Sequence, residues 1–104
     1  MDAQLHALSD ATRRRILTMV WREERTAGEI AAGFAMSRPS VSQHLSVLLE
    51  SKLVAVRRAK TRRFYRANRE AIERLRSELE ALWDNSLDAL KAQTEAAERG
   101  KSGR

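Results

Sequence analysis

One stretch decides the fold of this chain: Ser37-Arg38-Pro39-Ser40-Val41-Ser42-Gln43-His44-Leu45-Ser46-Val47-Leu48-Leu49. It opens as helices open, because Ser37 can cap the first backbone N–H groups and Pro39 suits the first turn, where its missing N–H is not needed. An apolar stripe follows at helical spacing, formed by Val41, Leu45 and Leu48. The opposite face carries small hydroxyls and an amide, with the imidazole of His44 on its flank.

That polar face is typical of a DNA-recognition helix. Gln side chains pair with adenine edges, Ser hydroxyls contact bases and phosphates, and short side chains let the backbone come close. A helix that only faces solvent usually carries several charges, whereas Arg38 is the only formal charge between Ser37 and Leu49. We therefore predict that this helix contacts DNA through Ser37, Arg38, Ser40, Ser42, Gln43 and His44.

Length and composition indicate one globular domain with a modest core, since the chain has 104 residues and is 42% apolar. We expect residues 1–96 to form a DNA-binding and dimerisation domain and residues 97–104 a flexible tail. The chain has no Cys, which excludes disulfides, thiolate zinc sites and Cys nucleophiles. With no secretory signal and no apolar run long enough to span a membrane, these features predict a cytoplasmic protein.

The net charge of +6 is concentrated in one segment. Residues 57–76 hold nine basic and two acidic residues, whereas residues 1–56 carry a net charge of +1 and residues 77–104 one of −2. So local a basic patch predicts contact with a polyanion. An anionic membrane surface would attract the same charge, but the segment lacks the apolar helical face that inserts into a membrane.

Two further helices are expected before the Ser37 helix, beyond a short helix at the N-terminus. One is capped by Ser9 or Asp10 and runs from Ala11 to about Arg25. It carries the triplet 13–15 of arginines, which fits either a helix surface or a DNA contact. The other begins at a capping box, with Thr26 at the N-cap and Glu29 three residues later. Because only a tight turn separates this short helix from the Ser37 helix, the pair is predicted to be a helix-turn-helix.

A basic β-hairpin is expected directly after the helix-turn-helix. Residues 53–58 and 62–67 alternate like strands on either side of a turn at 59–61, and the interval from Arg57 to Arg69 holds seven Lys/Arg and no acid. Protection of an exposed sheet edge would explain charge there, though not charge of one sign only. We predict that the hairpin is a wing that contacts DNA through Lys60, Thr61, Arg62 and Arg63.

A long last helix is predicted from Arg69 to about Ala96, after a cap at Asn68. Its apolar residues repeat at the three- and four-residue spacing of a coiled coil, over a face wider than packing within one small domain requires. Packing within its own domain is the alternative to pairing with a second copy. The predicted dimer interface consists of Leu5, Leu8, Ile72, Leu75, Leu79, Leu82, Trp83 and Ser86.

The predicted fold is therefore mainly helical with a β-hairpin: a winged helix-turn-helix of four helices, two strands and a long last helix, dimeric through its first and last helices. Three segments resemble the ArsR family of winged-helix repressors. Residues 8–17, LSDATRRRIL, resemble the family's opening L-S-D-x-T-R-R-x-I-L, residues 27–31 its third helix, and residues 37–48 its recognition helix. The resemblance implies a dimeric bacterial repressor that binds a short inverted repeat and often controls its own gene.

The chain departs from the metal-sensing branches of that family. Those branches place Cys pairs in the third helix, or His with acidic residues along the last helix. Here residues 26–30 hold no Cys, and the last helix offers carboxylates such as Asp84 and Asp88 without a His. Since zinc and nickel prefer nitrogen and sulfur ligands, we predict that the protein binds no metal and no cofactor.

Two alternatives stay open beside a plain repressor that binds double-stranded operator DNA as a homodimer. An apolar small-molecule inducer would have a pocket at Trp21, Phe34 and Trp83, although core packing also explains these residues. A protein-interaction module would use the long last helix. An enzyme is not expected, because no base and nucleophile are paired in the sequence.

Overall fold

The computed structural model describes residues 1–102, and the side chains of residues 1–95. The chain forms two compact units, Met1–Glu73 and Arg74–Arg104. The first unit contains four short helices, a three-stranded antiparallel sheet and the start of a fifth helix, which continues as the second unit. This is the predicted class of fold, with one strand more than expected.

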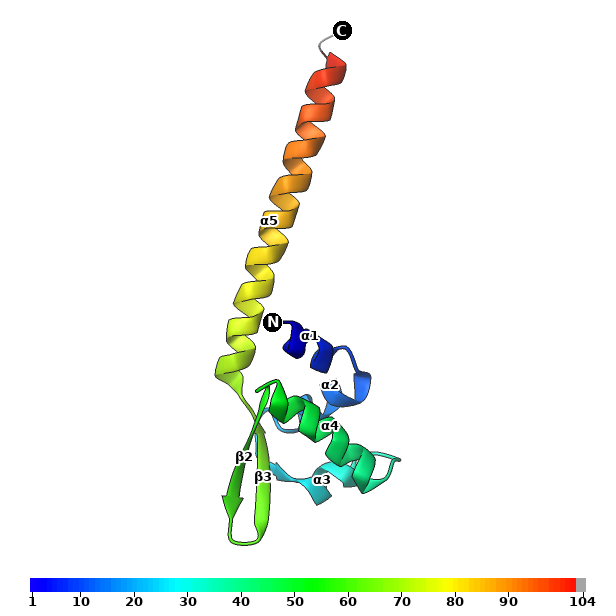
Figure 1. Cartoon of the computed structure of the whole chain (residues 1–104), viewed down its shortest axis with the longest axis vertical. Helices are drawn as coiled ribbons and strands as arrows, with labels where there is room; N and C mark the ends of the chain where they lie inside the picture. Colours follow the sequence, from blue (N-terminus) through cyan, green and yellow to red (C-terminus); the bar gives the residue numbers. More distant parts are fainter. Residues whose placement is uncertain (103–104) are drawn as a thin grey trace. The chain divides into compact units, whose positions relative to one another are not determined.

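The elements of the first unit follow one another closely along the chain (Figure 1). Their bounds are α1 (Asp2–Leu8), α2 (Ala11–Met19), β1 (Arg25–Thr26), α3 (Ala27–Ala32), α4 (Arg38–Glu50), β2 (Val54–Ala59) and β3 (Arg62–Ala67). The sheet order is β1-β3-β2, so β3 lies in the middle. Helices α3 and α4 are the helix-turn-helix, and β2 with β3 forms the hairpin.

Side-chain caps start the helices where the sequence predicts them. The Asp10 carboxylate accepts a hydrogen bond from the backbone N–H of Arg13 at 3.0 Å. Thr26 and Glu29 form a complete capping box. The Ser37 hydroxyl accepts from the backbone N–H of Ser40 at 3.3 Å, and Pro39 lies in the first turn of α4. These local bonds satisfy N–H groups that lack helical partners.

The core of the first unit lies behind α4. Val41, Leu45 and Leu48 of that helix are buried, as their spacing predicts. They are joined by large, fully buried side chains from α2, α3 and the approach to the hairpin: Ile16, Val20, Ile30 and Leu53. The apolar stripe of α4 is thus used inside the domain, which leaves its polar face outward.

Helix α2 ends at Met19, and the prediction that it continues to about Arg25 is wrong. The Val20 carbonyl accepts a hydrogen bond from the backbone N–H of Ala67 at 2.9 Å, which ties the chain to the end of β3. Arg25 and Thr26 then pair with Tyr65 and Phe64 as the short strand β1. Pairing with a distant strand replaced the last turns of the helix.

The hairpin turn is shorter than predicted. Ala59 pairs with Arg62 in the antiparallel register, so β2 runs one residue beyond the expected strand and the turn consists of Lys60 and Thr61. Lys60 adopts a left-handed backbone with φ of 58°. The predicted contact residues therefore lie at the very tip of the hairpin and on the first residues of β3.

Helix α5 (Arg69–Ser102) begins where expected, with the Asn68 side chain accepting from the backbone N–H of Ala71 at 3.2 Å. It continues to Ser102 rather than ending near Ala96, because the added residues are mostly good helix formers and a single Gly does not stop them. The predicted tail, 97–104, lies outside the residues whose side chains are described. Within the described part of the chain, no helix is long and apolar enough to cross a membrane.

Candidate nucleic-acid interface

The outward face of α4 carries the predicted recognition residues. Ser37, Arg38, Ser42 and Gln43 are exposed, and Ser40 is half-buried. The hydroxyls of Ser37 and Ser40 lie 3.0 Å apart and share a hydrogen bond. Gln43 forms no hydrogen bond with any described residue, so both ends of its amide are available to a ligand.

His44 is partly engaged within the protein. Its Nδ1 lies 3.3 Å from Nη1 of Arg13 and 3.7 Å from the carboxylate of Asp10. The backbone hydrogen bond from Arg13, together with His44 and Arg13 nearby, lowers the pKa of Asp10. This contact holds one edge of the imidazole against the start of α2. His44 therefore has one ring nitrogen engaged within the protein, whereas the Gln43 amide is not engaged.

The arginine triplet of α2 serves the protein's own backbone. Arg13 donates to the carbonyls of Ala7 and His6, at 2.7 and 3.1 Å, and Arg14 donates to that of Leu8 at 2.8 Å. These bonds add hydrogen bonds to carbonyls at the end of α1.

Arg15 has a matching role at the turn between α3 and α4. It donates to the carbonyl of Gly33 at 3.3 Å, and its guanidinium lies 4.5 Å from the centre of the Phe34 ring. Of the two interpretations that the sequence allowed for the triplet, the structure favours the structural one.

The tip of the hairpin is exposed and its cations are uncompensated. Lys60, Thr61, Arg62 and Arg63 are all exposed. Among the described residues, none of these three cations lies in an ion pair. A cluster of exposed like charges is unfavourable in the free protein, and a polyanion relieves that repulsion.

Arg57, at the root of the same hairpin, is engaged in the protein. Its guanidinium forms a two-pronged ion pair with the carboxylate of Glu24, with one Nε–Oε2 distance of 3.1 Å, and lies 4.8 Å from the centre of the Phe64 ring. The hydrogen bond to Arg57 lowers the pKa of Glu24. Because Glu24 directly precedes β1, the Arg57 side chain bridges all three strands across Phe64.

A groove of about 770 Å³ lies between the recognition helix and the hairpin. It is bounded by Thr26 and the first residues of α3, by Arg38 at the start of α4, and by Thr61, Arg62, Arg63 and Tyr65 of the hairpin. The sequence did not point to this groove, nor to Tyr65 and Gly28 in its wall. The only available signal was the strand alternation that places Tyr65 on the same face as Arg63.

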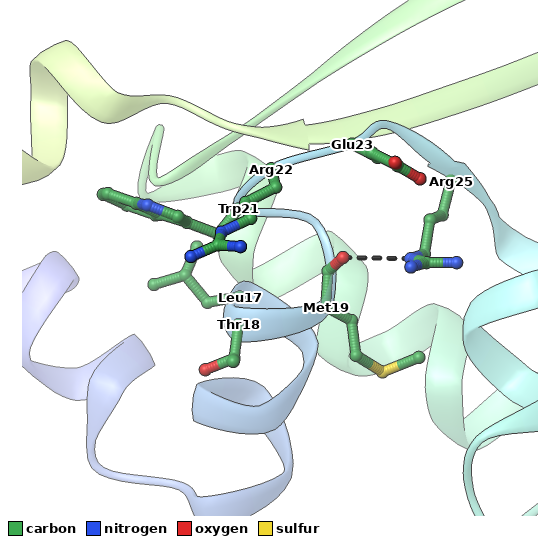
Figure 2. Close-up of a pocket in the computed structure, with 7 residues that line it drawn as sticks. All are labelled: Leu17, Thr18, Met19, Trp21, Arg22, Glu23 and Arg25. Atoms are coloured by element: carbon green, nitrogen blue, oxygen red, sulfur yellow. Dashed lines mark hydrogen bonds between the residues drawn. The ribbon is translucent and has the colours of Figure 1, made fainter.

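The residues of the predicted effector pocket divide between the two units, with Trp21 and Phe34 in the first and Trp83 in the second. Trp21 lines an open hollow of about 620 Å³ with Leu17 and several polar side chains, and there Arg25 donates to the carbonyl of Met19 (Figure 2). Phe34 is not among the lining residues and lies beneath Arg15. Trp83 belongs to the second unit, where it is 65% exposed.

The predicted dimer residues fall into exposed and covered groups. Leu5, Leu82, Trp83 and Ser86 are exposed, whereas Leu8, Ile72 and Leu79 are half-buried and Leu75 is buried. Leu87 and Leu90 continue the exposed apolar face of the second unit. Large apolar side chains exposed together on one helix are typical of a surface that binds another protein chain.

No group of three or more His, Asp or Glu side chains in the described residues is close enough to hold a metal ion. The carboxylates of α5 therefore do not gather with a nitrogen ligand within that part of one chain. That the protein binds no metal stays a prediction.

A helix-turn-helix whose second helix presents a polar face, followed by a two-stranded hairpin with a basic tip, defines a winged helix-turn-helix DNA-binding protein. A family model described as a helix-turn-helix domain matches residues 8–57. The chain is 40% identical over 86 residues to the HTH-type transcriptional regulator Rv2034 of Mycobacterium tuberculosis, an alignment that covers 83% of this chain and 80% of that protein.

Solved structures of similar proteins have the same fold. The ArsR-like transcriptional regulator from Rhodococcus sp. RHA1 superposes with a TM-score of 0.76 at 32% identity, covering 91% of this chain and 90% of that one. The homodimeric winged helix-turn-helix DNA-binding domain of Mb0332 from Mycobacterium bovis superposes with a TM-score of 0.65 at 30% identity, covering 80% and 77%. The chain belongs to the ArsR family of winged helix-turn-helix transcriptional regulators, which are not enzymes.

Proposed function

We propose that this protein is a transcriptional repressor that binds an inverted-repeat operator as a homodimer. One such operator controls the repressor's own gene. The observation that carries the proposal is the pairing of two different DNA-binding surfaces on one small unit. One is the exposed polar face of α4, and the other is the basic hairpin tip whose cations have no partners among the described residues. The first suits base edges in the major groove, and the second suits phosphates.

Repression follows from occupancy. A dimer that covers about one or two turns of a promoter competes with the transcription machinery for the same DNA, without any chemistry of its own. The recognition contacts proposed are Ser37, Arg38, Ser40, Ser42, Gln43 and His44, and those of the wing are Lys60, Thr61, Arg62 and Arg63.

Dimerisation is supported by the exposed apolar side chains of α5 and by the homodimeric structural neighbour. Leu82 is 52% exposed and Trp83 65% exposed, although both are large apolar side chains. We propose that a second copy covers this face together with Leu5 and Leu8 of α1. The hollow beside Trp21 is open and Phe34 does not line it, so the proposal includes no apolar inducer.

The test is charge reversal at the wing tip. Arg62→Glu with Arg63→Glu should weaken binding to all DNA sequences alike, and should flatten the dependence of affinity on salt by about one unit of slope for each lost phosphate contact. Affinity is measured by fluorescence anisotropy at several salt concentrations, on genomic fragments that the purified protein retains.

The matched control reverses two exposed charges elsewhere, Arg22→Glu with Lys91→Glu, and so makes the same change in net charge. This control should keep the wild-type salt slope. Normal DNA binding by the wing-tip variant at moderate salt would refute the assignment of the wing.

A further inference from the structure

The groove between the recognition helix and the hairpin has the features of a binding site. Its wall is formed by Thr26, Ala27, Gly28, Glu29, Arg38, Thr61, Arg62, Arg63 and Tyr65. Three arginines and three residues that carry hydroxyls therefore line one hollow of about 770 Å³. All of these residues belong to the first compact unit, so one compact part of the chain forms the whole site.

The charge in this groove is positive. Glu29 is its one carboxylate, and that carboxylate is already engaged by the backbone N–H and the hydroxyl of Thr26, at 3.2 and 3.0 Å. These two hydrogen bonds lower the pKa of Glu29. In contrast, Arg38 forms no hydrogen bond or ion pair with any described residue, so its guanidinium is available to an anion.

The Arg38 guanidinium packs beside Gly28. A Cβ on Gly28 would lie 3.5 Å from Nη2 of Arg38, which shows that the guanidinium rests directly against the backbone at the start of α3. The Arg38 side chain is exposed and lines the groove. Arg62 and Arg63 face it from the hairpin.

Tyr65 supplies an independent observation. Its side chain is only 7% exposed, and its hydroxyl has no hydrogen-bond partner among the described residues. Among the described residues, every buried side-chain oxygen or nitrogen has a hydrogen-bond partner. Because the Tyr65 hydroxyl has none, it is not buried and reaches the protein surface. The hollow that Tyr65 lines is this groove. The ring is thus packed in the core while its hydroxyl is open to a hydrogen-bond partner from outside the protein, as is common for tyrosines at interfaces.

We propose that the groove binds one phosphodiester of the DNA backbone, with the Tyr65 hydroxyl and the Arg38 guanidinium donating hydrogen bonds to it. The proposal rests on the proposed function and adds a contact that it does not contain. A hydroxyl beside a guanidinium matches a phosphate, which accepts hydrogen bonds from both. A DNA strand that contacts both the recognition helix and the wing has to pass the gap between them, where this groove lies.

The test removes one oxygen atom. Tyr65→Phe keeps the ring in the core, so the melting temperature should stay close to that of the wild type. Affinity should fall about tenfold on operator and on scrambled DNA alike, as expected for a hydrogen bond to a charged group. The salt slope should not change, because a neutral hydroxyl releases no counterion, whereas Arg38→Gln should lower the slope by about one.

Ethylation interference identifies the atom that is bound. Ethylation of one phosphate in each half-site should block the wild-type protein and should no longer add to the loss in the Tyr65→Phe variant. The control is Arg66→Gln, which changes the next residue of β3 on the opposite face of the strand, away from the groove. It should show the wild-type interference pattern.

The outcomes separate this inference from the function on which it rests. If the wild type binds DNA and Tyr65→Phe binds it equally well, the phosphate contact is refuted and the proposed repressor function is unaffected. If the wild type retains no DNA, both the phosphate contact and the proposed repressor function are refuted. Inorganic phosphate is the second probe: if micromolar phosphate displaces DNA from the wild type but not from the Tyr65→Phe variant, the groove is a site for free phosphate instead.

Discussion

At the scale of single residues, the exposed side chains of α4 differ in how much of each is left for DNA. Gln43 has no partner among the described residues, the Ser40 hydroxyl is shared with Ser37, and one edge of the His44 ring is held by Arg13. Gln43 is therefore the side chain best placed to read a base. Ser40 can still accept or donate one further bond, because a hydroxyl has two lone pairs and one proton.

Gln43→Ala and Ser40→Ala should reduce discrimination between operator and scrambled DNA, each by about 1–3 kcal/mol where a base contact is lost. Non-specific binding should hardly change, since neither residue carries charge. Competition titrations with the two DNAs measure the ratio directly. Equal losses on both DNAs would move these residues to the phosphate-contacting class.

At the scale of elements, neighbouring arginines of β2 are expected to behave differently. Arg57 is bound to Glu24 over the ring of Phe64, whereas Arg58 is exposed and has no ion-pair partner among the described residues. The two point to opposite faces of the strand, as successive residues do. Both belong to the basic residues of the hairpin in the sequence, but only Arg58 has a charge that is not paired.

Arg57→Gln should therefore leave the salt dependence of DNA binding unchanged, whereas Arg58→Gln should lower its slope by about one if the strand reaches a phosphate. Each variant removes one charge from adjacent positions, so each serves as the control of the other. The slopes come from anisotropy titrations at several salt concentrations. A lower slope for Arg57→Gln would mean that the pair with Glu24 opens when DNA binds.

At the scale of the whole molecule, the proposed dimer places two recognition helices about 34 Å apart, so that they reach successive major grooves on one side of the duplex. Leu82→Glu puts a charge on the exposed apolar face of α5 and should give monomers without operator affinity. Leu82 is a better site for this test than Leu75, because Leu75 is buried and its replacement would also disturb folding.

The control is Ala81→Glu, which adds the same charge to an exposed neighbouring position on the opposite side of the helix. It should remain dimeric and bind the operator normally. Analytical ultracentrifugation measures both variants beside the wild type. A wild type that sediments as a monomer at micromolar concentration would contradict the proposed assembly.

The local features of this protein could be predicted from sequence. Caps at Asp10, Thr26 and Ser37 are made by side chains within three residues of the N–H groups they satisfy, so their effect is visible in a short stretch of sequence. The buried stripe of α4 and the hairpin follow from helical and strand periodicity in the same way. Together with the motif resemblance, these features determined the winged helix-turn-helix class.

Only the tertiary structure decided the features that depend on partners distant in the chain. Helix α2 ends at Met19 because the chain beyond it pairs with β3, more than forty residues later. The charge of Arg57 is paired with Glu24, and Tyr65 lines a groove together with residues 26–29 and Arg38. Composition and spacing show which charges and donors exist, but which of them remain free for DNA depends on which ones the fold brings together.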